Sequence, residues 1–71
     1  MTTAIQDTPD DWSIVDNSRL IGFVHRDDGW FTCRLTVPGQ AHKGHVHSEP
    51  MEGRFTSLEM AQAAIDKYKK I

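Results

Sequence analysis

The stretch of sequence that decides the fold is LIGFVHRDDGWFTCRLTV, residues 20–37. Two runs rich in β-branched and aromatic residues flank Asp28-Gly29, a pair that readily adopts the positive φ angles of a two-residue type I′ turn. The sequence therefore predicts a β-hairpin whose register is set by this turn. The predicted pairs are Asp27–Trp30, Arg26–Phe31, His25–Thr32, Val24–Cys33, Phe23–Arg34 and Gly22–Leu35.

This register sorts the hairpin's side chains onto two faces, because successive residues of a strand point to opposite sides of a sheet. One face is nearly all apolar and collects Leu20, Gly22, Val24, Phe31, Cys33, Leu35 and Val37. The other face collects Ile21, Phe23, His25, Trp30, Thr32, Arg34 and Thr36. We expect the first face to lie in the core and the second to face solvent.

A helix is predicted after the hairpin, where residues 53–65 read GRFTSLEMAQAAI. Residues 53–55 suit a last short strand. Thr56 and Glu59 then match the N-cap and N3 positions of a capping box. On a helical wheel the apolar residues cover one arc, which is expected to pack on the apolar sheet face. The arc contains Leu58, Met60, Ala61, Ala64, Ile65, Tyr68 and Ile71.

The remaining segments complete the predicted organisation. Residues 1–11 are acidic and show no periodicity, which predicts a flexible acidic tail. Residues 12–16 are typical of a first strand, and residues 38–53 form a long His-rich loop with a short strand around residues 45–47. Residues 12–71 are thus expected to form a single β-β-β-(β)-α domain. Its predicted class is α+β, an antiparallel three- to four-stranded sheet packed on one face by a single C-terminal α-helix.

Composition and charge narrow the classes of function. The 71 residues, 38% of them hydrophobic and 25% charged, suit one globular domain, and no apolar run approaches the roughly 20 residues of a membrane span. A single cysteine and the lack of a secretory leader predict a soluble, cytoplasmic protein. Net charge is −2, and residues 1–18 contain four acidic residues but no Lys or Arg. Such a balance predicts only weak non-specific attraction to nucleic acid.

Catalysis is not expected, because no motif for it is present. The sequence contains no nucleophile elbow, phosphate-binding glycine loop or metalloprotease helix. Asp27 and Asp28 are explained by the turn. Glu49 and Glu52 lie in the loop, where so small a domain offers no deep pocket to tune them. We therefore expect a protein that is not an enzyme and needs no cofactor.

The solvent-side face of the hairpin is the candidate partner-binding surface. Exposed aromatic rings supply contact area, and Arg34 supplies a planar donor for a phosphate, a base edge or a carboxylate. The partner-binding residues predicted on this basis are Phe23, His25, Trp30, Thr32 and Arg34. The other interpretation is that Trp12, the first strand or the long loop folds over this face and forms a second small core.

A second candidate site is the run of histidines in the loop. His42, His45 and His47 have the spacing H-x-x-H-x-H, so two imidazoles on an extended chain could share a metal ion. No further pair of Cys or His completes the ligand set, and Cys33 falls on the core face, where a lone thiol behaves as a small hydrophobe. Metal binding therefore remains an alternative function with an incomplete set of ligands.

The strand-to-helix junction at residues 53–65 carries a resemblance to a known family. Its pattern, Gly-x-Phe leading through Thr/Ser into Leu-Glu-x-Ala-x-x-Ala-Ile, resembles the arm-type, AP2-like DNA-binding domains of phage and transposon integrases. It also resembles short phage-encoded proteins without assigned function. In that family a three-stranded sheet carries one helix, and the sheet face opposite the helix enters the DNA major groove. The resemblance extends over about residues 20–69 and implies that Phe23, His25, Trp30, Thr32 and Arg34 contact the partner.

This chain departs from the family in charge. The family's sheet face usually carries several Lys or Arg, whereas this face carries one Arg beside bulky aromatic rings, and residues 1–11 are acidic. We therefore predict a non-enzymatic adaptor or inhibitor of phage or mobile-element type that contacts a host or phage protein. DNA binding by the same face is the alternative, metal binding by the loop is the second, and the face would also allow a homodimer.

Overall fold

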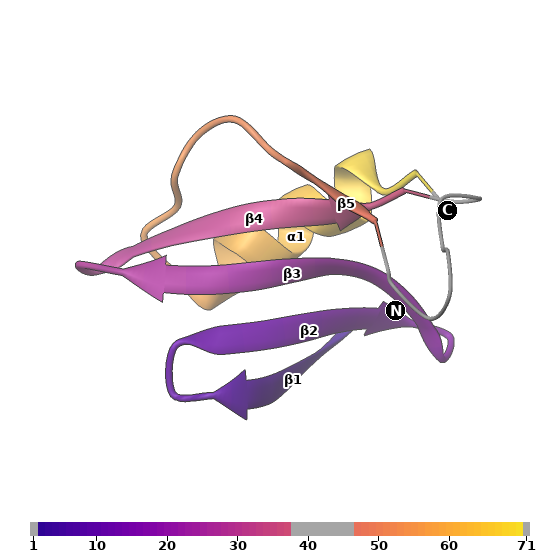
Figure 1. The fold of residues 1–71 in the computed structure, drawn as a ribbon, viewed down its shortest axis with the longest axis horizontal. Helices are drawn as coiled ribbons and strands as arrows, with labels where there is room; N and C mark the ends of the chain where they lie inside the picture. Colours follow the sequence, from indigo (N-terminus) through magenta and orange to yellow (C-terminus); the bar gives the residue numbers. More distant parts are fainter. Residues whose placement is uncertain (1, 38–46, 71) are drawn as a thin grey trace.

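Five strands follow one another in sequence order to form one antiparallel sheet, and a single helix packs against one of its faces (Figure 1). The computed structural model describes residues 2–37 and 47–70. The α+β class predicted from the sequence is confirmed, with five strands in place of three or four. The elements are β1 (Thr2–Thr8), β2 (Asp11–Asp16), β3 (Arg19–Asp27), β4 (Trp30–Thr36), β5 (Ser48–Pro50) and α1 (Leu58–Tyr68).

The hairpin of β3 and β4 has the predicted register, pair by pair from Asp27–Trp30 to Gly22–Leu35. Asp28 and Gly29 have φ angles of 52° and 81°, the positive values that a type I′ turn needs. A second tight turn joins β2 to β3, and there Asn17 and Ser18 also have positive φ, 52° and 65°. Both turns match the right-handed twist of the strands they connect, which fixes the register of the three central strands.

The N-terminal segment differs from the prediction. Where the sequence predicted a tail, Thr2–Thr8 forms β1 and pairs with β2, from Thr2–Asp16 to Thr8–Asp11. The backbone of β2 gains a hydrogen-bonding partner in this way. Most side chains of β1 are exposed and polar, so the strand lacks the apolar alternation by which a strand is recognised in sequence.

The last strand also lies elsewhere. β5 comprises Ser48–Pro50, immediately after the positions around residues 45–47 where a short strand was predicted, and residues 53–55 do not form a strand. Phe55 instead makes a single bridge to Phe31: the amide of each residue donates to the carbonyl of the other, at 2.9 and 2.8 Å. The segment after β5 therefore contacts β4 through this bridge and through the Met51 amide, which donates to the Cys33 carbonyl at 2.9 Å.

α1 begins one residue later than predicted. Ser57 is the N-cap, with extended φ and ψ of −144° and 157°, and its hydroxyl accepts a hydrogen bond from the Met60 amide at 3.2 Å. The assignment of Thr56 and Glu59 to a capping box is therefore wrong. The Thr56 hydroxyl lies 3.4 Å from the Met60 sulfur instead, and Ser57 takes the position from which a side chain reaches the N3 amide.

Replacing Ser57 by alanine is expected to lower the free energy of unfolding by about 1 kcal/mol, because the Met60 amide loses its acceptor. Urea denaturation monitored by circular dichroism measures the change. Thr56→Ala is the matched control and should leave the midpoint nearly unchanged. A larger loss for Thr56→Ala than for Ser57→Ala would contradict the cap assignment.

The core lies between α1 and the sheet. The buried apolar residues come from β2, β3, β4 and the helix; they are Trp12, Ile14, Ile21, Val24, Cys33, Leu35, Ala61 and Ile65. The helix contributes fewer residues than its predicted arc, since Met60 and Tyr68 are 52% and 55% exposed. No helix within residues 2–37 and 47–70 is both long enough and apolar enough to cross a membrane.

Two residues predicted to face solvent are buried. Ile21 has 1% exposure because the register shifts beside it: Ile14 pairs with Gly22 whereas Val15 pairs with Leu20. Ile21 is therefore an extra residue in β3, and a bulge of this kind interrupts the alternation of side chains. Thr36, at the end of β4, is also buried, and its hydroxyl has no hydrogen-bonding partner in the described part of the chain.

Candidate binding face

The sheet face opposite α1 carries a row of side chains that crosses all five strands; we call this face the open face. The row follows from the register, in which each residue pairs with the next across the sheet. It consists of Ile5, Ser13, Phe23, Arg34 and Pro50. A neighbouring row, Asp11, His25 and Thr32, lies one step toward the β3–β4 turn. The face is thus built by register rather than by any one segment.

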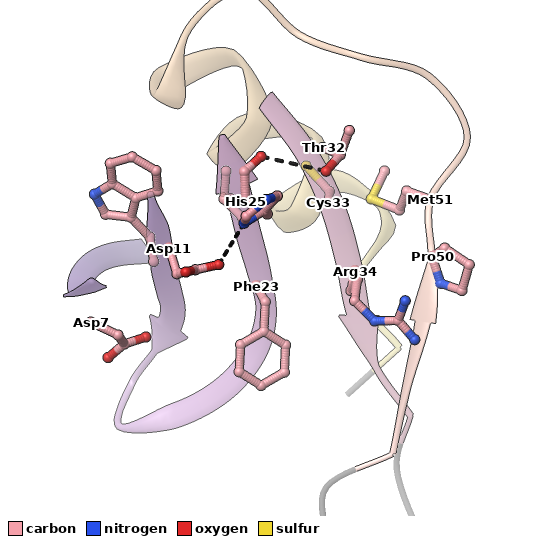
Figure 2. Close-up of a pocket in the computed structure, with 11 residues that line it drawn as sticks. Asp7, Asp11, Phe23, His25, Thr32, Cys33, Arg34, Pro50 and Met51 are labelled. Atoms are coloured by element: carbon pink, nitrogen blue, oxygen red, sulfur yellow. Dashed lines mark hydrogen bonds and ion pairs between the residues drawn. The ribbon is translucent and has the colours of Figure 1, made fainter. Parts of the chain in front are cut away.

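Four of the five predicted partner-binding residues line one depression of about 570 Å³ on the open face (Figure 2). They are Phe23, His25, Thr32 and Arg34, and β1, β2 and the segment at β5 add Asp7, Asp11, Pro50 and Met51. The sequence did not indicate these additional residues. Asp7, Asp11 and Pro50 gave no strand signal because they are polar or proline, and Met51 lies just after β5, outside any strand.

Trp30, the fifth predicted residue, lies apart from the depression, at the turn end of β4. Trp30 is 40% exposed, and the guanidinium carbon of Arg54 lies 4.8 Å from the ring centroid. This stacking is a cation–π contact that covers part of the indole. Trp30 is thus available at the margin of the open face, with Arg54 as its neighbour.

His25 and Asp11 form an ion pair on the open face. His25 Nδ1 lies 2.7 Å from Asp11 Oδ1, and the Thr8 hydroxyl donates to Asp11 Oδ2 at 2.6 Å. The hydrogen bond to Asp11 raises the pKa of His25. The hydrogen bonds from Thr8 and then from His25 lower the pKa of Asp11. The pair therefore ties β1, β2 and β3 together while both groups stay accessible.

The protonation of His25 gives a direct test of this pair. NMR titration of the imidazole is expected to give a pKa above its ordinary value of 6.5, because the Asp11 carboxylate stabilises the charged ring. Since the folded-state pKa is the higher one, the pair stabilises the fold below pH 6.5, and this stabilisation is lost as pH rises through the folded-state pKa.

Asp11→Asn should move the midpoint of His25 back toward 6.5, whereas Asp28→Asn, which removes a carboxylate in the turn, is the matched control. Equal effects of the two substitutions would show that general charge, and not the contact with Asp11, shifts the imidazole.

Fixed charges flank the aromatic ring of Phe23. On one side, the Arg34 guanidinium donates to the Ser48 hydroxyl at 2.8 Å and to the Ser48 carbonyl at 2.9 Å, which holds the side chain against β5. On the other side, the Ser13 hydroxyl donates to the Asp7 carboxylate at 2.5 Å. The open face therefore presents carboxylates over β1 and β2, an aromatic ring on β3 and a guanidinium on β4.

Trp12 does not cover the open face. Its ring is buried in the core cluster, 5.7 Å from the Phe31 ring, and the Arg26 guanidinium lies 5.7 Å from the Trp12 centroid. The first strands extend the sheet instead of folding over it. A second small core made by Trp12 or by the first strand is therefore wrong. The corresponding prediction for the loop concerns residues 38–46, which lie outside the described residues.

The histidine site is only partly within the described residues. His42 and His45 lie outside them, and His47 is exposed. Across residues 2–37 and 47–70, no group of three His, Cys, Asp or Glu side chains is arranged to hold a metal ion. Cys33 is a buried free cysteine whose thiol lies 3.6 Å from the Ala61 carbonyl, and burial raises its pKa to about 11. At neutral pH it is an unreactive core thiol.

Comparisons of the chain with protein-family models, with curated proteins and with solved structures found no match.

Proposed function

We propose that this chain is a small, non-enzymatic binding module that contacts another protein through its open face. The observation that supports the proposal is the aromatic ring of Phe23, lying on the middle strand between a fixed guanidinium and fixed carboxylates. Groups anchored by neighbours lose little conformational freedom on binding, and aromatic residues with Arg are typical anchors of protein interfaces. The face thus combines apolar area with a defined charge pattern.

A protein partner fits this charge pattern better than DNA does. Asp7 and Asp11 lie on the open face, where they would repel phosphates, and Arg34 already donates two hydrogen bonds to Ser48. The second positive charge, on protonated His25, is neutralised by Asp11. Binding to a nucleic acid backbone depends on several uncompensated cations. We therefore retain DNA binding only as an outcome to be tested.

The proposed partner is a host or phage protein, as the resemblance to short phage-encoded proteins implies, and the proposed role is that of a cytoplasmic adaptor or inhibitor. Its complementary surface should offer an apolar side chain to Phe23 and a carboxylate near Arg34. It should also offer a donor or cation to the carboxylates over β1 and β2. Such a pattern would orient the partner across the strands.

Capture from host lysate by immobilised protein tests the proposal. Phe23→Ala and Trp30→Ala should each weaken capture of the partner at least about 30-fold, as expected when an anchoring aromatic side chain is removed. Met60→Ala is the matched control, because Met60 is also a large apolar residue and is exposed, but it lies on the helix, which covers the other face. Capture that survives Phe23→Ala, or that is lost with Met60→Ala as well, would contradict the proposal.

Stability and DNA titrations separate the alternatives. Trp30→Ala should cost roughly 1 kcal/mol or less in folding, whereas Leu35→Ala, in the core, should cost about 2–5 kcal/mol. Equal losses would make Trp30 a fold determinant.

In ¹⁵N-resolved NMR spectra, short duplex DNA at low salt should leave the amides of Phe23, Trp30 and Arg34 unchanged. Shifts there that vanish steeply with salt would favour the DNA alternative.

A further inference from the structure

The two edge strands of the sheet, β1 and β5, differ in length and composition. β5 is short, comprising Ser48–Pro50, and contains a proline, both of which protect an edge strand from further pairing. β1 is longer, comprising Thr2–Thr8, and stands at the other end of the sheet order (Figure 1). It contains no Lys, Arg or Pro. β5 is therefore protected by its short length and its proline, whereas the protection of β1 is limited to Asp7 and the register irregularity between Gln6 and Thr8.

The backbone groups that β1 presents outward follow from the hydrogen-bonding pattern of the sheet. The Arg26 amide donates to the Asp10 carbonyl, so in the β2–β3 ladder the bonded pairs fall at the even residues of β2, Trp12 and Ile14. The odd residues of β2 then bond to β1, through the pairs Ser13–Ile5 and Val15–Thr3. Thr2, Ala4 and Gln6 are left with amides and carbonyls that point away from the sheet.

The outward-pointing amides and carbonyls of β1 can pair with the same groups of a second copy. If a second β1 runs antiparallel with a two-fold axis at Ala4, Thr2 of each copy pairs with Gln6 of the other, and Ala4 pairs with Ala4. The three outward residues then meet in bonded pairs and make about six hydrogen bonds between the copies. Asp7 stands at the register irregularity of β1, beyond the paired residues, so no like charges face each other.

The side chains agree with this pairing. On the open face, Ile5 of each copy would lie opposite Thr3 of the other, in the closely spaced non-bonded pairs where β-branched side chains contact best. Ile5 is 50% exposed in the single chain, so it has area to bury. On the helix side the residue at the axis is alanine, which is small enough for two copies to approach.

We propose that β1 is a self-association edge, and that two copies of this chain join β1 to β1 into one continuous antiparallel sheet. The contact is isologous, so it closes at a dimer. The two-fold axis runs perpendicular to the sheet, and both open faces therefore point the same way. The inference does not rest on the function proposed for those faces, but it would make the module bivalent.

Sedimentation equilibrium of the purified full chain over a range of concentrations tests the dimer. The wild type should fit a reversible monomer–dimer equilibrium. Ala4→Pro removes an amide that points outward and bonds to no strand of residues 2–37 and 47–70, so it should weaken dimerisation at least about tenfold. Ala4→Ser keeps the amide at the same position and is the matched control. Far-ultraviolet circular dichroism and the urea midpoint should show that both variants remain folded.

A second variant keeps the test decisive if proline disturbs β1 itself. Ile5→Lys places two like charges diagonally across the axis, on an exposed position of the single chain, and should weaken the dimer in a manner that added salt partly restores. A wild type that stays monomeric at millimolar concentration would overturn the inference. A dimer weakened by Phe23→Ala but unaffected by Ala4→Pro and Ile5→Lys would place the contact on the open face instead, and larger assemblies would contradict the closed two-fold geometry.

Discussion

Replacing Gly22 by alanine is expected to lower the free energy of unfolding by about 3 kcal/mol or more, a large fraction of the stability of so small a domain. A Cβ atom at this position would lie 2.6 Å from the Arg34 carbonyl oxygen and 2.8 Å from Ile65 Cγ2. The carbonyl belongs to the neighbouring strand and the Ile65 side chain to the helix. The backbone would therefore have to move, because only one of the two obstacles is a side chain.

A double-mutant cycle with Ile65→Ala measures how the two obstacles share this loss. Ile65→Ala removes Cγ2 and Cδ1, the two side-chain atoms that crowd residue 22, but leaves the Arg34 carbonyl in place. The double variant should therefore lose about 1 kcal/mol less than the sum of the single losses, without reaching the stability of Ile65→Ala alone. Urea midpoints of the four proteins provide the measurement. Simple additivity would mean that the helix does not pack as closely on Gly22 as described.

Ile65→Ala by itself is expected to cost about 2–5 kcal/mol, because a fully buried side chain would be truncated where the helix meets the sheet. Ile65 has 0% exposure and lies over Gly22, where the absence of a side chain lets α1 approach β3. The cavity would open at α1, and the described part of the chain contains no second helix to fill it. Thermal unfolding monitored by circular dichroism measures the loss.

Met60→Ala is the control for Ile65→Ala, and it is expected to change stability by less than about 0.5 kcal/mol. The sequence predicted both residues in the apolar arc of the helix, yet Met60 is 52% exposed. Similar losses for the two substitutions would mean that the whole predicted arc packs, and that the core is wider than described. A small loss for both would mean that the helix is only loosely attached.

The accuracy of the sequence prediction varied along the chain for identifiable reasons. The β3–β4 hairpin is confirmed in every predicted pair, because Asp28-Gly29 fixes the turn and the turn fixes the register. β1 was missed because pairing at a sheet edge uses backbone groups and leaves its side chains polar. The cap was misplaced because Thr56 and Ser57 are adjacent residues with equivalent hydroxyls, and only the backbone angles at Ser57 decide between them.

The candidate site was likewise predicted only in part from the sequence. Register placed Phe23, His25, Thr32 and Arg34 on one face, and the structure brings these four to one depression. The hairpin register did not reveal Asp7 or Asp11, whose carboxylates contribute negative charge to that depression, because Asp11 reaches it through the pairing of β2 with β3 and Asp7 through the pairing of β1 with β2. The partner-binding role of these residues stays a prediction.

The sequence by itself determined the elements whose causes are local: a hairpin set by its turn, a β2 strand before it and an amphipathic helix after it. It also determined the alternation of side chains along the hairpin strands, which separates the core face from the open face. Tertiary structure alone decided where Ile21 points, because the β-bulge arises from the pairing of β2 with β3. It also decided that Gly22 must lack a side chain and that residues 2–8 form a strand. These features depend on which backbones approach one another, and such contacts join residues whose own sequence neighbourhoods carry no sign of them.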